Sequence, residues 1–189
     1  MGIIAFAFGR GGTLGPFASL LQMTLHSLTK SAIFFSVGHI AQVKGTQKIA
    51  DIRGLTGSHP LLGWTLVAGV VAIAGLPPFG IFMSEFLVLS SAFARAPALA
   101  GLAAFGLLVA LGALLLRLSS IAFGESSGPA TPVRASYLPI FAHLGLVLIG
   151  GLYMPAALVA WFHNVAGVLR WRSLIPPTPI PLVPIVSTA

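Results

Sequence analysis

Long apolar runs are the feature that most restricts the fold of this sequence. The runs 14–41, 97–123 and 137–169 each exceed the roughly 20 helical residues that cross a hydrocarbon layer of about 30 Å. In lipid, the backbone polar groups of such a run can be paired within the run only if it is helical. The sequence therefore predicts an all-α fold, a polytopic transmembrane helix bundle.

Composition supports a lipid environment and excludes several classes of function. Charged residues make up 7% of the chain, against about a quarter in soluble domains, and the mean hydropathy is +1.00. The net charge of +7 comes from Lys and Arg scattered singly near the ends of apolar runs, which is typical of helix ends near lipid headgroups rather than of a nucleic-acid site. The chain has no cysteine, acid pair or His pair at ligand spacing, so we expect no metal, no iron–sulfur cluster and no cofactor.

The runs also define the expected domain organisation. Residues 1–9 are predicted to form a helix stub, and residues 1–169 together form the transmembrane bundle. Residues 170–189 form a tail rich in proline, which has no backbone donor for a helix.

The run 61–94 is expected to break near residues 75–80. Proline removes a backbone donor and clashes with the preceding turn, and this segment contains Gly75, Pro77, Pro78 and Gly80. Each arm is short for a complete crossing. The run is therefore either one discontinuous helix or a hairpin of two short helices, and the membrane orientation depends on which of these forms.

Polar residues at helical spacing mark the run 14–41. Gln22, His26 and Lys30 are four residues apart and are expected to share one helix face. An ionisable group at membrane depth costs about 2.5–3.5 kcal/mol, so Lys30 should face protein or water unless it reaches the interface. His39 should point away from Lys30 and lie near the helix end, as an interface residue or a proton exit.

Glu85 is the acidic residue that lies inside an apolar run, shortly after the proline pair. A carboxyl group there can exchange between neutral and charged forms, as a proton relay requires. It can also act only as one half of a structural ion pair between helices. The adjacent break favours the relay, because exposed backbone at membrane depth is tolerated where it is buried in protein or lines a wet cavity.

These motifs resemble those of a known family. The segments at residues 26–35, 49–55, 74–80 and 84–86 read HSLTKSAIFF, IADIRGL, AGLPPFG and SEF. In order and spacing they are similar to the antiporter-like membrane subunits of complex I, Mrp-type cation/proton antiporters and membrane-bound hydrogenases, with the hydrogenase-4 branch the most similar. The match covers about residues 1–125.

The resemblance implies a larger parent fold with two inverted repeats, of which this chain holds most of the second. It places Lys30 on the family's embedded Lys and Glu85 on the ionisable position of its second broken helix. It implies a proton-translocating subunit, without a redox centre of its own, of a respiratory redox complex in the bacterial inner membrane, with other membrane subunits as partners. The alternatives are a cation/proton antiporter module driven by ion gradients and a structural scaffold that conducts nothing.

Overall fold

The computed structural model describes residues 2–10, 14–125 and 136–174, and all regular structure in them is helical. The all-α class predicted from the sequence is confirmed. In chain order the elements are α1 (Gly2–Arg10), α2 (Gly15–Lys44), the 3-10 turn η1 (Ile49–Asp51), α3 (Leu55–Ser58), α4 (Pro60–Ile73), α5 (Gly80–Phe93), α6 (Pro97–Phe123), α7 (Leu138–Leu152) and α8 (Ala156–Leu174).

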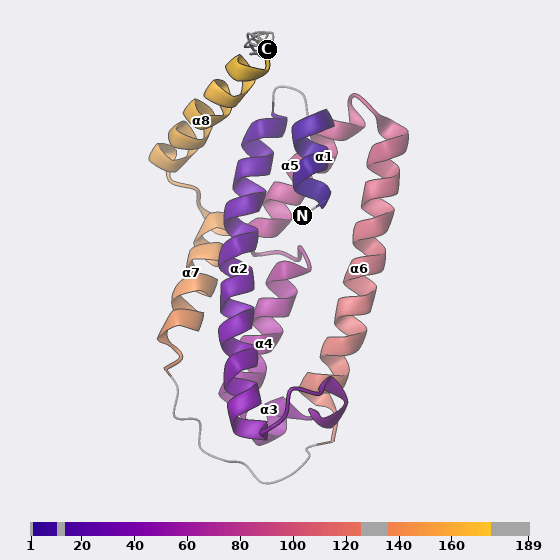
Figure 1. The fold of residues 1–189 in the computed structure, drawn as a ribbon, viewed down its shortest axis with the longest axis vertical. Coiled ribbons are helices and arrows are strands. Elements are labelled where there is room, and N and C mark those ends of the chain that lie inside the picture. Colours follow the sequence, from indigo (N-terminus) through magenta and orange to yellow (C-terminus); the bar gives the residue numbers. More distant parts are fainter. Residues whose placement is uncertain (1, 11–13, 126–135, 175–189) are drawn as a thin grey trace, which may run out of the picture.

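Helix α2 is the centre of the bundle (Figure 1). Its 30 residues make a rod of about 45 Å, and α1, α4, α5, α7 and α8 all pack against it. Proline in its first turn favours the helix start, where a missing N–H costs nothing. It ends at Gly45, whose left-handed backbone (φ +63°) directs its N–H to the carbonyl of Ala41.

Helices α4 and α5 are the two halves of one discontinuous element. They follow one another along the long axis of the bundle (Figure 1), so the hairpin alternative is not what forms. Residues 74–79 separate them and include both prolines. Gly75 ends α4 with a left-handed backbone, φ +69°, which residues other than glycine rarely adopt. The break therefore follows from the local sequence.

The predicted span 137–169 is a bent pair rather than one straight helix. Helices α7 and α8 make an angle of 85° at the residues before and including Pro155. Helix α8 continues to Leu174, so residues 170–174 are helical, and residues 175–189 of the expected tail lie outside the described residues.

Among the described helices, α6 is long and apolar enough to cross a membrane by itself, and α7 with residues 156–168 passes only as a bent pair. Helices α4 and α5 are apolar but, at 14 residues each, are too short to cross by themselves. Helix α2 is long enough, but Gln22, His26 and Lys30 lower its hydropathy. A helix of this kind suits the inside of a bundle rather than a lipid-facing position.

The two breaks meet in the middle of the bundle. A side chain on Gly151 of α7 would lie 2.7 Å from the N atom of Gly80, and one on Gly150 would lie 2.9 Å from the Leu25 side chain of α2. Backbone therefore packs directly on backbone at this level. The absence of side chains at these glycines allows α7 to approach the start of α5.

Candidate functional site at the broken helix

The carboxylate of Glu85 lies directly over the glycine that ends α4. Glu85 is on the second turn of α5 and is half-buried. A Cβ atom on Gly75 would be 3.0 Å from the carboxyl carbon of Glu85 and in severe contact with one of its oxygens. Gly75 thus has two functions, since it adopts the left-handed turn and leaves room for the carboxylate.

Gln22 of α2 holds Glu85 from the other side. Its Nε2 donates a hydrogen bond to Glu85 Oε1 at 3.4 Å, and its side-chain oxygen accepts from the Ser84 hydroxyl. Gln22 and Ser84 are both fully buried. In this arrangement the amide presents its donor to the carboxylate.

A cavity of about 260 Å³ opens beside the carboxylate, between the α4–α5 break and α6. Glu85 is the ionisable member of a lining otherwise made of Gly, Ala, Leu and Phe side chains. The cavity is large enough for several water molecules, at about 30 Å³ each. Glu85 therefore lies between its buried contact with Gln22 and a cavity large enough for water.

The predicted polar stripe on α2 does not lie in one environment. Gln22 is buried, His26 is half-buried and Lys30 is exposed. Four residues advance a helix by about 40° more than a full turn, so a series at this spacing drifts around the helix from the core to the outside. No hydrogen bond or ion pair joins Lys30 to Glu85 in the part of the chain that is described.

His39 lies on the opposite side of α2 from Lys30, inside the bundle. Its ring is 8% exposed and contacts Tyr137 edge-on, with ring centroids 5.4 Å apart. Its Nδ1 atom is buried without a hydrogen-bond partner among the described residues. The buried hydroxyls of Ser36 and Thr29 lie on the same side of α2, each bonded to the carbonyl four residues earlier.

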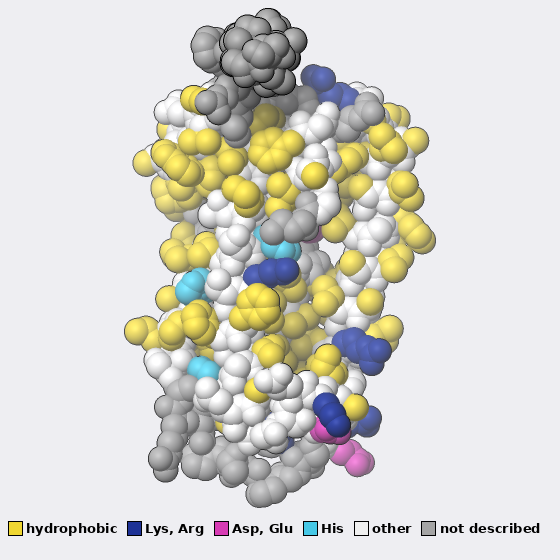
Figure 2. Space-filling view, in the orientation of Figure 1, with side chains coloured by type: hydrophobic (Ala, Val, Ile, Leu, Met, Phe, Trp, Pro, Cys, Tyr) yellow, Lys and Arg dark blue, Asp and Glu magenta, His cyan; other side chains and the backbone are white. Residues whose placement is uncertain are grey.

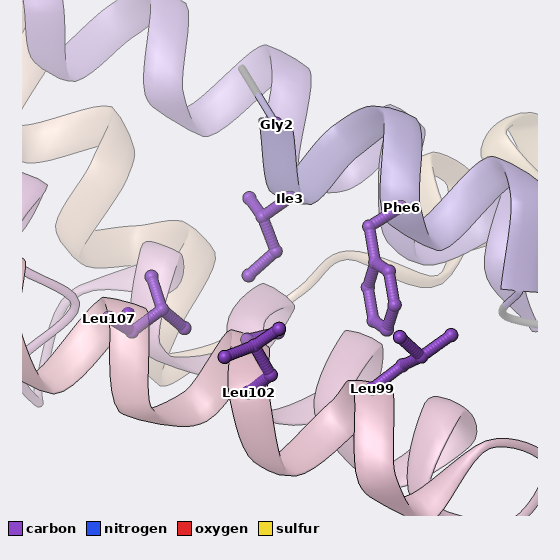
Figure 3. A pocket seen from close by; sticks show the side chains of 8 residues that line it. Gly2, Ile3, Phe6, Leu99, Leu102 and Leu107 are labelled. Atoms are coloured by element: carbon purple, nitrogen blue, oxygen red, sulfur yellow. The ribbon is translucent and has the colours of Figure 1, made fainter.

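A second cavity, of about 430 Å³, lies between α1 and α6 (Figure 3). Ile3 and Phe6 of α1 point toward Leu99 and Leu102 of α6 across it. Its lining is apolar, so it suits lipid tails or apolar side chains rather than ions. Leu107 of α6 lines both this cavity and the one beside Glu85.

Sequence reasoning did not identify the contacts that orient Glu85. Gln22 was predicted only as part of a stripe, and its partners Ser84 and Glu85 are 62 and 63 residues away in the sequence. The motif containing Gly75 predicted a break in the helix. It did not predict that the Glu85 carboxylate would lie against Gly75. Gly150 and Gly151 give no local signal, since glycine pairs are common in membrane helices.

The contact between Gly75 and the Glu85 carboxylate predicts that Gly75→Ala loses proton uptake. Both Gly75→Ala and the control Gly45→Ala place alanine in a left-handed backbone, at a cost of about 1–2 kcal/mol. Gly45 has open space around it, whereas the new methyl group at position 75 displaces the Glu85 carboxylate. We expect only Gly75→Ala to lose Glu85-dependent proton uptake, measured with a pH-sensitive dye in membrane vesicles. Equal losses in the two variants would show that backbone strain, not this contact, is responsible.

Comparison with known proteins agrees with this architecture. Residues 1–112 match the family model of the transmembrane NADH:quinone oxidoreductase/Mrp antiporter proteins. The chain is 61% identical over 170 residues to a hydrogenase-4 component F homolog from Methylacidiphilum infernorum, which covers 90% of this chain and 36% of that protein. The chain thus spans about a third of this relative's length.

Two solved structures share the fold. A chain of respiratory complex I from Thermus thermophilus superposes with a TM-score of 0.77 at 26% identity, covering 89% of this chain and 36% of that one. A chain of the Mrp complex from Dietzia sp. superposes with a TM-score of 0.66 at 17% identity, covering 84% of this chain and 38% of that one. With the broken helix and the family match, these likenesses show that the chain is an integral membrane protein and belongs to the NADH:quinone oxidoreductase/Mrp antiporter transmembrane family.

Proposed function

We propose that this chain is a proton-translocating part of a membrane subunit in a respiratory redox complex, of the NADH:quinone oxidoreductase or hydrogenase-4 type. The observation that carries the proposal is the setting of Glu85 at the break between α4 and α5. Its carboxylate is held by Gln22 and seated on Gly75, and it lines a cavity that has room for water. A carboxyl group in this position can take up a proton from water on one side and release it on the other.

The energetic argument is that an ionisable group at membrane depth needs support. A charged side chain there costs about 2.5–3.5 kcal/mol or more, and such residues usually mark ion or proton pathways. The Gln22 donor stabilises the charged form of Glu85, while the largely apolar cavity stabilises the neutral form. A change of nearby charge would shift the balance between these two forms.

The other predicted residues extend the pathway along α2. His26 and Lys30 lead away from Gln22 toward the outside of the bundle, and His39 lies inside it near the other end of the helix. The buried Thr29 and Ser36 hydroxyls lie between the levels of Gln22 and His39. We propose that water connects these side chains. The Thr29 and Ser36 hydroxyls themselves donate to backbone carbonyls of α2.

The relatives suggest the setting. One is named as a hydrogenase component and another as NADH-quinone oxidoreductase subunit M, and the structural match belongs to complex I. We propose that residues 1–169 form one transmembrane domain with the tail beyond it, in a bacterial inner membrane. Its partners are other membrane subunits of such a complex. Electron transfer in a partner changes the charge near Glu85.

The antiporter alternative predicts a different driving force. Inverted membrane vesicles with the complete assembly should acidify on addition of electron donor, with or without sodium. An imposed sodium gradient without donor should move no protons. Acidification of vesicles that requires sodium, and that persists without donor, would support a cation/proton antiporter instead.

A further inference from the structure

Helix α6 lines two cavities that lie next to each other along its length. Its residues from Leu99 to Leu107 line the α1–α6 cavity of Figure 3, and its residues from Ala104 to Leu111 line the cavity beside the α4–α5 break. The two linings overlap by about one helical turn. Among the described residues, Leu107 is the one that lines both cavities, so its side chain forms the wall between them.

Leu107 is the large side chain where the two linings overlap. It is half-buried, and the lining residues in the preceding turn of α6, which are Ala103, Ala104 and Gly106, are small. A Cβ atom on Gly106 would meet nothing within 4 Å. Figure 3 shows the Leu107 side chain projecting from α6 at the end of the cavity away from Leu99. Shortening this one side chain would therefore leave little to separate the two cavities.

An apolar wall of this kind stops water. Figure 2 shows hydrophobic side chains along the upper half of α6 on this face, and the described lining of the α1–α6 cavity contains no ionisable side chain. Water in a narrow apolar constriction loses hydrogen bonds that the walls cannot replace, so such constrictions stay dry and act as gates. A proton moves between side chains through water or other hydrogen-bonding groups, so a dry wall also stops protons.

The position of the wall matters because Glu85 lies on one side of it. The cavity beside Glu85 measures about 260 Å³, whereas the α1–α6 cavity measures about 430 Å³ and extends from Leu107 toward the start of α6. If water joined the two cavities, Glu85 would exchange protons through a second route. A carboxyl group that is open to two routes at once lets protons return down their gradient, and translocation is then lost as leak.

We propose that Leu107 is a hydrophobic barrier that keeps the water beside Glu85 out of the α1–α6 cavity, and thereby determines the route by which Glu85 exchanges protons. The effect on proton movement rests on the function proposed for Glu85. The separation of the two cavities rests only on the packing around α6, and it can be measured independently.

The test measures how fast a water-soluble reagent reaches the cavity beside Glu85 in the intact assembly, in membrane vesicles. The 189 residues contain no cysteine, so Ala74→Cys places a single thiol in the lining of this cavity, on the side opposite to α6. A methanethiosulfonate with a trimethylammonium group does not cross lipid, and it reacts with the thiolate, which forms only where water is present. The reagent is added to each membrane face in turn, and mass spectrometry follows the labelling of the peptide that contains residue 74.

Leu107→Ala should raise the labelling rate several-fold from one membrane face. Leu107→Asn should do the same, because its side chain has a similar shape but hydrogen-bonds water, and this variant decides the question if the smaller residue disturbs assembly. Leu102→Ala is the matched control, since Leu102 lines only the α1–α6 cavity and is 68% exposed. Unchanged labelling in both Leu107 variants, or an equal increase in Leu102→Ala, would overturn the proposal.

Proton leak separates this proposal from the proposed function. Without electron donor, vesicles that contain Leu107→Ala should lose an imposed pH gradient several-fold faster than the wild type, and adding Glu85→Gln should restore the slow loss. If labelling increases but the gradient is lost at the wild-type rate, Leu107 is the barrier to water, and the proton exchange proposed for Glu85 is what fails.

Discussion

Glu85→Gln is expected to abolish proton translocation by this part of the subunit while the complex still assembles. Glutamine has nearly the same shape and can keep the hydrogen bond to Gln22, so the packing around the break is preserved. It cannot take up or release a proton at neutral pH. Donor-driven acidification of vesicles should fall to near background, while the amount of assembled complex in native gels stays at the wild-type level.

The matched control is Glu125→Gln, which removes the same charge from an exposed residue just after α6. It should translocate protons as well as the wild type. If Glu85→Gln translocated protons fully, Glu85 would be no more than a structural residue. The scaffold alternative would gain support if Lys30→Met and Glu85→Met together also left activity intact, because an ionisable residue with only a structural role can often be replaced by an apolar residue of similar size.

Gly151→Ala is expected to have the largest effect on stability. The added methyl group would lie 2.7 Å from the Gly80 nitrogen and 2.7 Å from the Phe79 carbonyl carbon, and these are backbone atoms that cannot rotate away. Overpacking in a close contact costs about 1–3 kcal/mol, and here it separates two broken helices at once. The melting temperature of the solubilised assembly should fall clearly. It can be followed by aggregation or by a fluorescence assay that does not use a thiol-reactive dye.

Gly145→Ala is the control for this variant, since it lies on the same helix and has open space where the methyl group would go. Alanine is the better helix former, so this variant should match or slightly exceed the wild-type melting temperature. Equal melting temperatures for the two variants would mean that α7 does not pack on the start of α5 as described.

The break between α4 and α5 shows how far local sequence could be used. A proline pair with flanking glycines predicts a break near residues 75–80 because the missing backbone donor and the ring clash act within one turn. In the structure, the residues between the two arms are 74–79. Whether the two arms formed a hairpin or one element was not predictable, since that depends on what α2 and α6 offer each half.

The environment of Lys30 illustrates the opposite case. Spacing correctly placed Lys30 and His39 on opposite sides of α2, but it did not show which side was buried. Burial depends on the helices that surround α2, and residues four apart drift around the helix by about 40° at each step. The hydrogen bond between Gln22 and Glu85 joins residues far apart in the chain, so no local pattern could indicate it.

By itself, the sequence determined the helical class and the membrane environment, and it predicted a break near the proline pair. These follow from hydropathy and proline chemistry, which act over a few neighbouring residues. Only the tertiary structure decided that Glu85 rests on Gly75 beside a cavity, that the two broken helices meet through glycines, and that Lys30 is exposed. Those features depend on how helices distant in the chain approach one another, which is set by packing across the whole bundle.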